Sequence, residues 1–274
     1  MPASRSPGPD TRSLKTPRAT PQPRSYWPVA LIGVAALLAV IIAILPASIV
    51  AHFLPPSVLA EDFSGTVWHG SAGRISVNAR DAGALEWRLH PAALFGAVVA
   101  AELHWVKVGF VIDAAVKIDR QGMTLHGVKG RGSIEDLNDM GFAVGWRGSA
   151  EIDFSELKSD FAKPLAAVGD IRVSNLTSAR IADGADLGSY DLRLPEGAVD
   201  ADGNVSAQLR DTGGPLDAQA VLHYSAKERT GLLTGTIRER PDAPPALRSQ
   251  LESLSRLRPR DPQGRIALDL EFAL

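Results

Sequence analysis

The sequence of 274 residues contains no cysteine. This absence excludes disulfide bonds, zinc sites built on thiolates and catalysis by a thiol nucleophile. It is compatible with the oxidising bacterial periplasm but does not indicate it, because a chain without cysteine is stable in any redox compartment. Aromatic residues are also scarce, at 6% of the chain. Each of the five tryptophans is therefore a candidate anchor of an apolar core.

The sequence also lacks the motifs of common enzymes. There is no Gly-x-Ser-x-Gly elbow, and the glycines Gly122 and Gly127 are followed by Val128 where a phosphate-binding loop needs lysine. The residues from Asp200 to Asn204 resemble part of a calcium loop, but Leu209 stands where such a loop carries its bidentate glutamate. A plain hairpin turn explains these residues better.

The histidines are dispersed, and no two have the spacing of a zinc-binding His-Glu-x-x-His helix. Most alternate onto the polar faces of predicted strands, where we expect exposed or singly hydrogen-bonded side chains. They are His52, His69, His90, His104, His126 and His223. We therefore expect no catalytic, cofactor-binding or metal-binding residues and no enzymatic activity.

One long apolar stretch runs from Val29 to Ala51, and no charged side chain occurs between Val29 and Leu45. A bilayer core of ~30 Å needs about 20 mostly apolar helical residues, which this stretch supplies if the helix continues past Pro46 and Ser48. It predicts a single transmembrane helix over residues 29–51. A cleaved signal peptide is the main alternative, because small residues at Ala47, Ser48 and Ala51 offer a processing site. The unbroken apolar run is longer than the ~7–15 residues usual for such a peptide.

The residues before the apolar stretch are basic and rich in proline. Seven of the 19 prolines fall in residues 1–28. The segment carries one acid, Asp10, and five basic residues, namely Arg5, Arg12, Lys15, Arg18 and Arg24. It predicts a disordered tail over residues 1–28, since it cannot bury enough apolar surface to offset the entropy of ordering. The positive-inside rule places this tail in the cytoplasm and everything from residue 52 onward beyond the membrane. We expect the tail to meet anionic membrane lipid and not nucleic acid.

Residues 52–274 have the two-residue periodicity of half-buried strands. Apolar residues alternate with polar ones from Leu85 to Leu89, from Phe110 to Ile118, from Leu216 to Tyr224 and from Ile266 to Phe272. A sheet with one buried and one solvent-exposed face is typically antiparallel. We predict a mainly β domain over 52–274, beyond the membrane, built as an antiparallel meander.

Turns and short helices punctuate these strands. The segments that begin with aspartate and end with glycine at Asp119–Gly122, Asp200–Gly203 and Asp261–Gly264 favour type I turns. Short helices are predicted at His90–Gly96 and from Ser133 to near Gly141. A longer helix is predicted from Pro245 to about Leu257, where four leucines recur at helical spacing, at positions 247, 251, 254 and 257.

Several glycine and tryptophan motifs occur in a fixed order along the chain. They are Leu45-Pro46-Ala47-Ser48, Gly65-Thr66-Val67-Trp68-x-Gly70, Leu85-x-Trp87-x-Leu89-x-Pro91-x-x-Leu94, Leu187-Gly188 and Asp211-x-Gly213-Gly214. We predict that Trp68 and Trp87 are core anchors of the first strands. In these motifs the chain resembles the type II secretion system protein N family, and more distantly the AsmA-like proteins. The resemblance covers Leu45 to the end of the chain. It implies that the meander is a curved, open periplasmic sheet shaped like a taco or half-barrel.

The resemblance implies an accessory, single-pass protein of the bacterial inner membrane, with its large domain in the periplasm. Such a protein would support the passage of folded proteins across the outer membrane through interfaces with other subunits of the secretion system. A second class stays open, in which the apolar face of a curved sheet carries a lipid or another apolar ligand. Coverage of the face from Phe110 to Ile118 by the protein itself would argue against a carrier. The oligomeric state is left open.

Overall fold

The computed structural model describes residues 27–136 and 145–273, and the chain forms two compact units, Met1–Ile42 and Ala43–Leu274. Helix α1 (Trp27–Ala43) makes up the described part of the first unit. It contains no charged residue, and its side chains from Gly33 to Ala43 are exposed. The predicted tail over 1–28 lies outside the described residues, except for Trp27 and Pro28, which open α1.

The predicted segment 29–51 is not one continuous helix. Helix α1 ends at Ala43, Pro46 is extended, and a 3₁₀ helix η1 follows at Ala47–Phe53. Proline explains the break, because its ring clashes with the carbonyl group four residues earlier and it donates no hydrogen bond to a helix. Within the described residues, no helix combines the length and apolar character that crossing a membrane requires.

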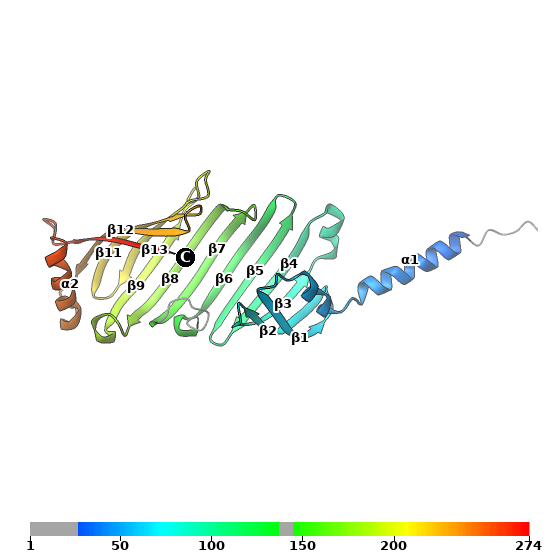
Figure 1. Cartoon of the computed structure of the whole chain (residues 1–274), viewed down its shortest axis with the longest axis horizontal. Helices are drawn as coiled ribbons and strands as arrows, with labels where there is room; N and C mark the ends of the chain where they lie inside the picture. Colours follow the sequence, from blue (N-terminus) through cyan, green and yellow to red (C-terminus); the bar gives the residue numbers. More distant parts are fainter. Residues whose placement is uncertain (1–26, 137–144, 274) are drawn as a thin grey trace, which may run out of the picture. The chain divides into compact units, whose positions relative to one another are not determined.

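The second unit is a single sheet of thirteen antiparallel strands, each paired with its neighbours in sequence (Figure 1). The strands are β1 (Val58–Gly65), β2 (His69–Val77), β3 (Arg80–Leu89), β4 (Val99–Lys107), β5 (Phe110–Asp119), β6 (Gly122–Ser133), β7 (Trp146–Ser159), β8 (Pro164–Ser178), β9 (Asp186–Leu194), β10 (Val205–Gly213), β11 (Leu216–Ser225), β12 (Thr230–Glu239) and β13 (Ile266–Ala273). The predicted open antiparallel meander is thus confirmed.

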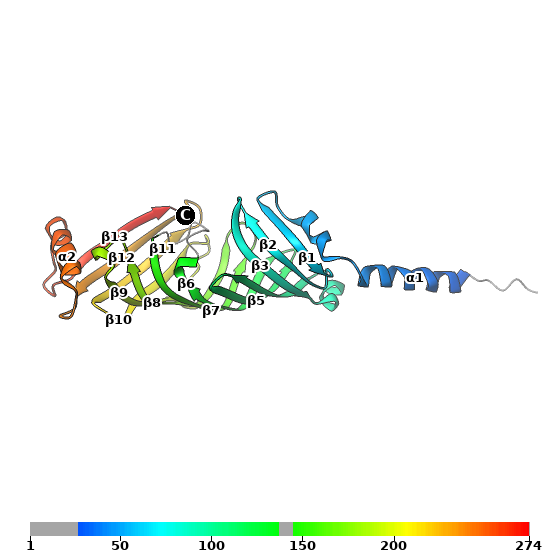
Figure 2. The same ribbon diagram turned by 90° about the horizontal axis from the view of Figure 1, so that it is seen from below.

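The sheet is curved, and both of its ends rise away from the middle strands (Figure 2). Register shifts interrupt five of the twelve strand pairings: β2 with β3, β5 with β6, β7 with β8, β8 with β9, and β9 with β10. Such bulges bend a strand and increase its local twist. They account for a sheet that curves instead of lying flat.

Strand alternation gives the sheet one apolar and one polar face. Cross-strand partners lie on the same face, so Trp87, Leu103 and Ala114 share the apolar face. Their neighbours Glu86, His104 and Asp113 form a matching row on the polar face.

The apolar face is packed with its own side chains. Phe110 is 1% exposed and Ile266 is fully buried. One cluster gathers Val128, Phe154, Ala167, Leu194, Ala198 and Ala207 from β6 to β10. A second forms around Phe110, Ile134 and Ala150. The face from Phe110 to Ile118 is therefore largely covered by the protein itself, with its five inward residues buried or half-buried.

Helix α2 (Pro245–Leu257) covers one end of the sheet. Leu247 and Leu251 are buried in a cluster with Leu187 and Ile266, and Leu254 packs against this cluster. Leu257, the last residue of the helix, continues the helical spacing of the other three leucines but is 82% exposed. Helical spacing alone cannot show where the supporting sheet ends.

The shorter predicted elements agree with the structure where it describes them. The 3₁₀ helix η2 (Pro91–Gly96) occupies the predicted helix at 90–96, and η4 (Ala182–Gly184) joins β8 to β9. The helix predicted after Ser133 falls partly on residues 137–144, outside the described part. All three aspartate turns are present, with the Asp119, Asp200 and Asp261 carboxylates each accepting hydrogen bonds from turn amides. Hydrogen bonds to the Asp200 carboxylate lower its pKa, and the largest contribution comes from the side chain of Asn204.

Candidate functional site: a polar hollow and two motif clusters

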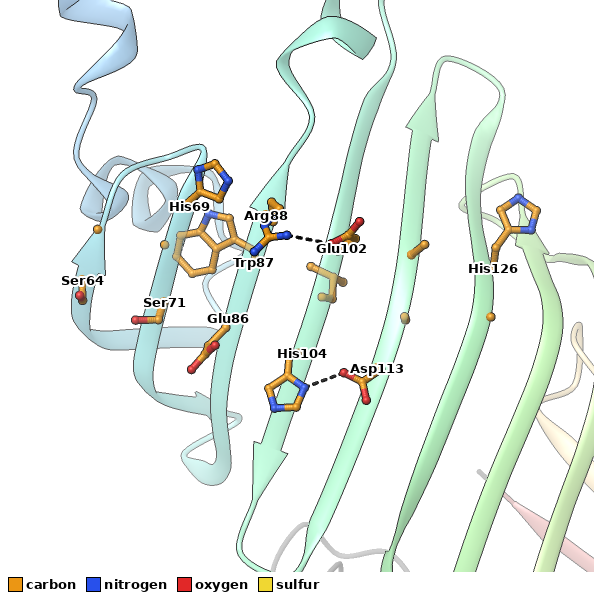
Figure 3. A pocket seen from close by; sticks show the side chains of 16 residues that line it. Ser64, His69, Ser71, Glu86, Trp87, Arg88, Glu102, His104, Asp113 and His126 are labelled. Carbon is orange, nitrogen blue, oxygen red and sulfur yellow. Dashed lines mark hydrogen bonds and ion pairs between the residues drawn. The ribbon is translucent and has the colours of Figure 1, made fainter.

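An open hollow of about 840 Å³ lies on the polar face near the start of the sheet (Figure 3). Its walls come from β1 to β6, and short or charged side chains of alternate residues project into it. The polar side chains that line it are Ser64, His69, Ser71, Glu86, Arg88, Glu102, His104, Asp113 and His126. Both signs of charge are present, with carboxylates in the majority.

The charged groups of the hollow pair across neighbouring strands. The Nδ1 nitrogen of His104 donates a hydrogen bond to Asp113 Oδ1 at 2.6 Å. Arg88 lies 3.8 Å from Glu102, whose other oxygen is 3.5 Å from Nε2 of His90. All of these side chains are substantially exposed, so each pair contributes only about 0–1 kcal/mol to stability.

The hollow is an open, polar surface. The hollow is open to solvent, whereas acid–base chemistry is strongest where water is excluded. Among the described residues, no three metal-ligating side chains converge on a point that could hold a metal ion. What the hollow offers is a patterned polar surface.

The histidines lie where alternation predicted them, exposed or half-exposed. Three of them, His69 on β2, His104 on β4 and His126 on β6, line the same hollow, which sequence reasoning did not predict. Alternation placed each on a polar face, but the register that places them around one hollow depends on pairing between strands. No signal in a single sequence fixes that register.

The first motifs meet in one assembly, which we call the Trp87 cluster: Leu45, Pro46, Val67, Trp68, Trp87 and Leu89. The amide of Val67 donates to the Leu45 carbonyl at 2.9 Å, and Pro46 forms an isolated bridge with Thr66. The indole N–H of Trp87 donates to the Val67 carbonyl at 2.9 Å, and the Leu89 amide to that of Trp68 at 2.7 Å. The segment before η1 is thereby tied to the first three strands.

Two glycines make this assembly possible. A Cβ atom at Gly70 would lie 2.6 Å from the Trp87 ring, so the ring occupies the space that a side chain would need. Gly65 has a φ of 80°, and a Cβ there would approach the His69 carbonyl oxygen to 2.3 Å. The spacing of the motif therefore reflects a tight turn and a close ring contact.

The predicted anchor role is borne out only in part by burial. Trp87 also makes an edge contact with Phe63, at 6.5 Å between ring centroids, yet Trp68 and Trp87 are both half-buried. A large ring at the end of a sheet, with an N–H that needs an acceptor, is packed without being enclosed.

The later motifs form a second assembly, the Asp211 cluster: Leu187, Gly188, Tyr190, Asp211, Gly213, Gly214 and Arg240. A Cβ at Gly188 would lie 2.5 Å from the Gly213 carbonyl oxygen, so β9 and β10 approach closely here. The Asp211 carboxylate accepts hydrogen bonds from the Ala218 amide and the Arg240 guanidinium, which also donates to the Gly214 carbonyl. The cluster fastens the residue after β12 to the turn between β10 and β11.

Tyr190 lies beside this ion pair. Its hydroxyl donates to the Leu187 carbonyl at 2.6 Å. Burial, followed by the nearby carboxylates of Asp211 and Asp186, raises the pKa of Tyr190 to about 12. The folded cluster therefore favours the neutral, protonated form of the Tyr190 side chain.

Replacing Tyr190 by phenylalanine tests this coupling. Between pH 10.0 and about 12 the unfolded chain gives up the phenol proton while the folded chain keeps it, so stability falls as pH rises through this window. At neutral pH, Tyr190→Phe should lower the free energy of unfolding by about 1 kcal/mol through the lost hydrogen bond. Because phenylalanine cannot ionise, this deficit should shrink at about pH 11 in urea unfolding followed by tryptophan fluorescence. A deficit that is unchanged with pH would contradict the assignment.

The family comparison agrees with these clusters. A model of type II secretion system protein N matches residues 56–269. That range includes every motif residue of the two clusters except Leu45 and Pro46. Searches of curated proteins and of solved structures gave no match. Since the family model spans well over half of the sequence, the chain belongs to the type II secretion system protein N family.

Proposed function

We propose that the protein is a non-enzymatic accessory component of the type II secretion system and supports secretion of folded proteins through protein–protein interfaces. Family membership implies a component of this system and suggests contacts with its other subunits. The observation that supports the finer proposal is the polar face, on which charged side chains of both signs lie in rows across neighbouring strands.

The polar face continues beyond the hollow as rows of charges of both signs. One row runs across five strands through Arg131, Glu151, Arg172, Asp191 and Arg210. Arg172 lies 3.0 Å from Asp170 and 4.0 Å from both Glu151 and Asp191. Alternating charges favour a protein partner with a complementary pattern. Nucleic acid would instead require a basic stripe, so we do not expect it as a partner.

The proposal includes a place in the inner membrane, with a cytoplasmic N-terminus and a periplasmic sheet. Its support is the apolar character of α1, where Val34, Leu37, Leu38, Val40, Ile41 and Ile42 are all exposed. Aliphatic side chains exposed on all sides of a helix are costly in water and stable in lipid. The basic excess before Trp27 supports the orientation.

A carrier of lipid or another apolar ligand is not favoured. Such a carrier needs an apolar face that stays open along a groove, whereas Phe110 and Val116 are buried and their neighbours are at least half-covered. The hollow of about 840 Å³ is lined mainly by polar and charged residues, together with Trp87 and Leu103.

Deleting the gene should sharply reduce the amount of secreted enzymes in the medium and raise their amount in the periplasm. The full-length chain should restore secretion, and so should a chain whose residues 27–43 are exchanged for an unrelated apolar helix, because the interface resides in the sheet. The control is equal abundance of both chains in the membrane fraction. Normal secretion without the gene would refute the proposed role, and failure of the exchanged chain alone would assign recognition to the helix.

The topology is tested separately with spheroplasts. Added protease should digest the sheet and leave a small N-terminal fragment with the membrane, because residues after the apolar stretch would face the periplasm. A large soluble fragment starting near His52 would show cleavage of the apolar segment, and complete protection would place the sheet in the cytoplasm.

A further inference from the structure

The connection between β3 and β4 presents two large apolar side chains to solvent. Phe95 in η2 is 96% exposed, and the adjacent Leu94 is 46% exposed. The run from Pro91 to Ala101 contains no charged residue and no histidine. A benzyl ring with almost no contact to its own chain is unfavourable in water, so this tip is suited to a less polar environment.

The tip is held in a defined conformation. The Ala93 amide donates to the His90 carbonyl at 3.1 Å, the Ala97 amide to that of Leu94 at 3.0 Å, and the Val98 amide to that of Ala93 at 3.3 Å. Ala97 closes the turn with a φ of 55°. Because these amides already donate hydrogen bonds within the turn, the free-energy cost of moving this backbone out of water is lower. The exposed Phe95 is thus displayed by an ordered turn.

The position of this tip within the sheet unit is informative. We call the strand ends around Leu45, Val67, Leu89 and η2 the proximal rim. Leu45, which lies in the apolar stretch two residues after α1 ends, accepts a backbone hydrogen bond from Val67. Trp68 accepts one from Leu89, two residues before η2 begins. The apolar tip therefore lies on the same rim at which the apolar N-terminal segment joins the sheet. The opposite rim, at Val108, lies one strand length away along β4, or roughly 30 Å for nine residues.

We propose that η2 is a second membrane contact, in which Leu94 and Phe95 insert among the lipid headgroups and upper acyl chains of a phospholipid bilayer. This inference rests on the proposed membrane anchoring. If residues 29–45 are in lipid, Leu45 emerges at the bilayer surface, and η2 is held beside that point. Phe95 lies between Leu94 and Gly96, within a run from Pro91 to Ala101 that has no charged side chain, whereas the rim of a protein interface is usually polar. Two contacts would fix the rim against the bilayer instead of leaving the sheet to swing on one flexible joint.

The lack of native cysteine permits a direct test on the full chain. Single cysteines are introduced by Phe95→Cys, by Val108→Cys, which replaces a side chain 84% exposed at the opposite rim, and by Leu38→Cys in α1. Each variant carries an environment-sensitive fluorophore and is reconstituted into phosphatidylcholine and phosphatidylglycerol vesicles, with or without nitroxide-labelled lipid. Circular dichroism confirms that the sheet is intact in each variant.

The proposal predicts blue-shifted emission and strong nitroxide quenching at positions 38 and 95, with quenching at 95 several-fold greater than at 108. Quenching at 38 together with equal, weak quenching at 95 and 108 would overturn the second contact and leave the anchor intact. Absence of quenching at 38 would refute the anchor itself. Shielding of position 95 in native membranes but not in vesicles would assign the tip to a protein partner and overturn the lipid contact.

Discussion

The structure depends on one constraint: a single-layer sheet with one apolar face and no second sheet to cover it. Thirteen strands in a meander bring all their apolar residues to one side, and exposure of that surface would be unfavourable. The protein meets this constraint through bulges that curve the sheet, through clusters on the apolar face, and through α2 at the end that contains Ile266. The Trp87 and Asp211 clusters hold connections together near the two ends of the sheet, where fewer neighbouring strands contribute stabilising contacts.

The same alternation determines what remains for function. Because the apolar face is occupied by its own core, the accessible surface is the opposite one, where register aligns charged residues in rows across β2 to β10. The hollow lined by His69, His104 and His126 is a concavity on this face. A surface of exposed, moderately paired charges favours selective association over tight, buried contact. This agrees with an accessory subunit that assembles with other components.

The sequence was sufficient for those features that depend on local chemistry. Alternation predicted the strands, aspartate and glycine predicted the turns, and proline followed by glycine predicted η2. The sequence was insufficient where distant segments decide the result. Helix α1 ends at Ala43, ahead of Pro46 and of Leu45, whose carbonyl accepts a hydrogen bond from the Val67 amide. Leu257 is exposed although it continues the spacing of the buried leucines. The hollow could not be predicted, because its lining depends on how six strands pair with one another. The motif residues were recognised in the sequence through the family resemblance, and the contacts in the structure explain their spacing.

The most direct test of the account asks whether the polar face contacts other secretion subunits in the cell. A photo-crosslinking amino acid would replace His104 or His126 in the hollow, with Leu257 on α2, which is 82% exposed, as the control. We expect crosslinks to other subunits of the system from both hollow positions, few from position 257, and none from any position when the genes for the other subunits are deleted. Absence of crosslinks from the hollow in a strain that secretes normally would contradict the claim that this face is the working interface.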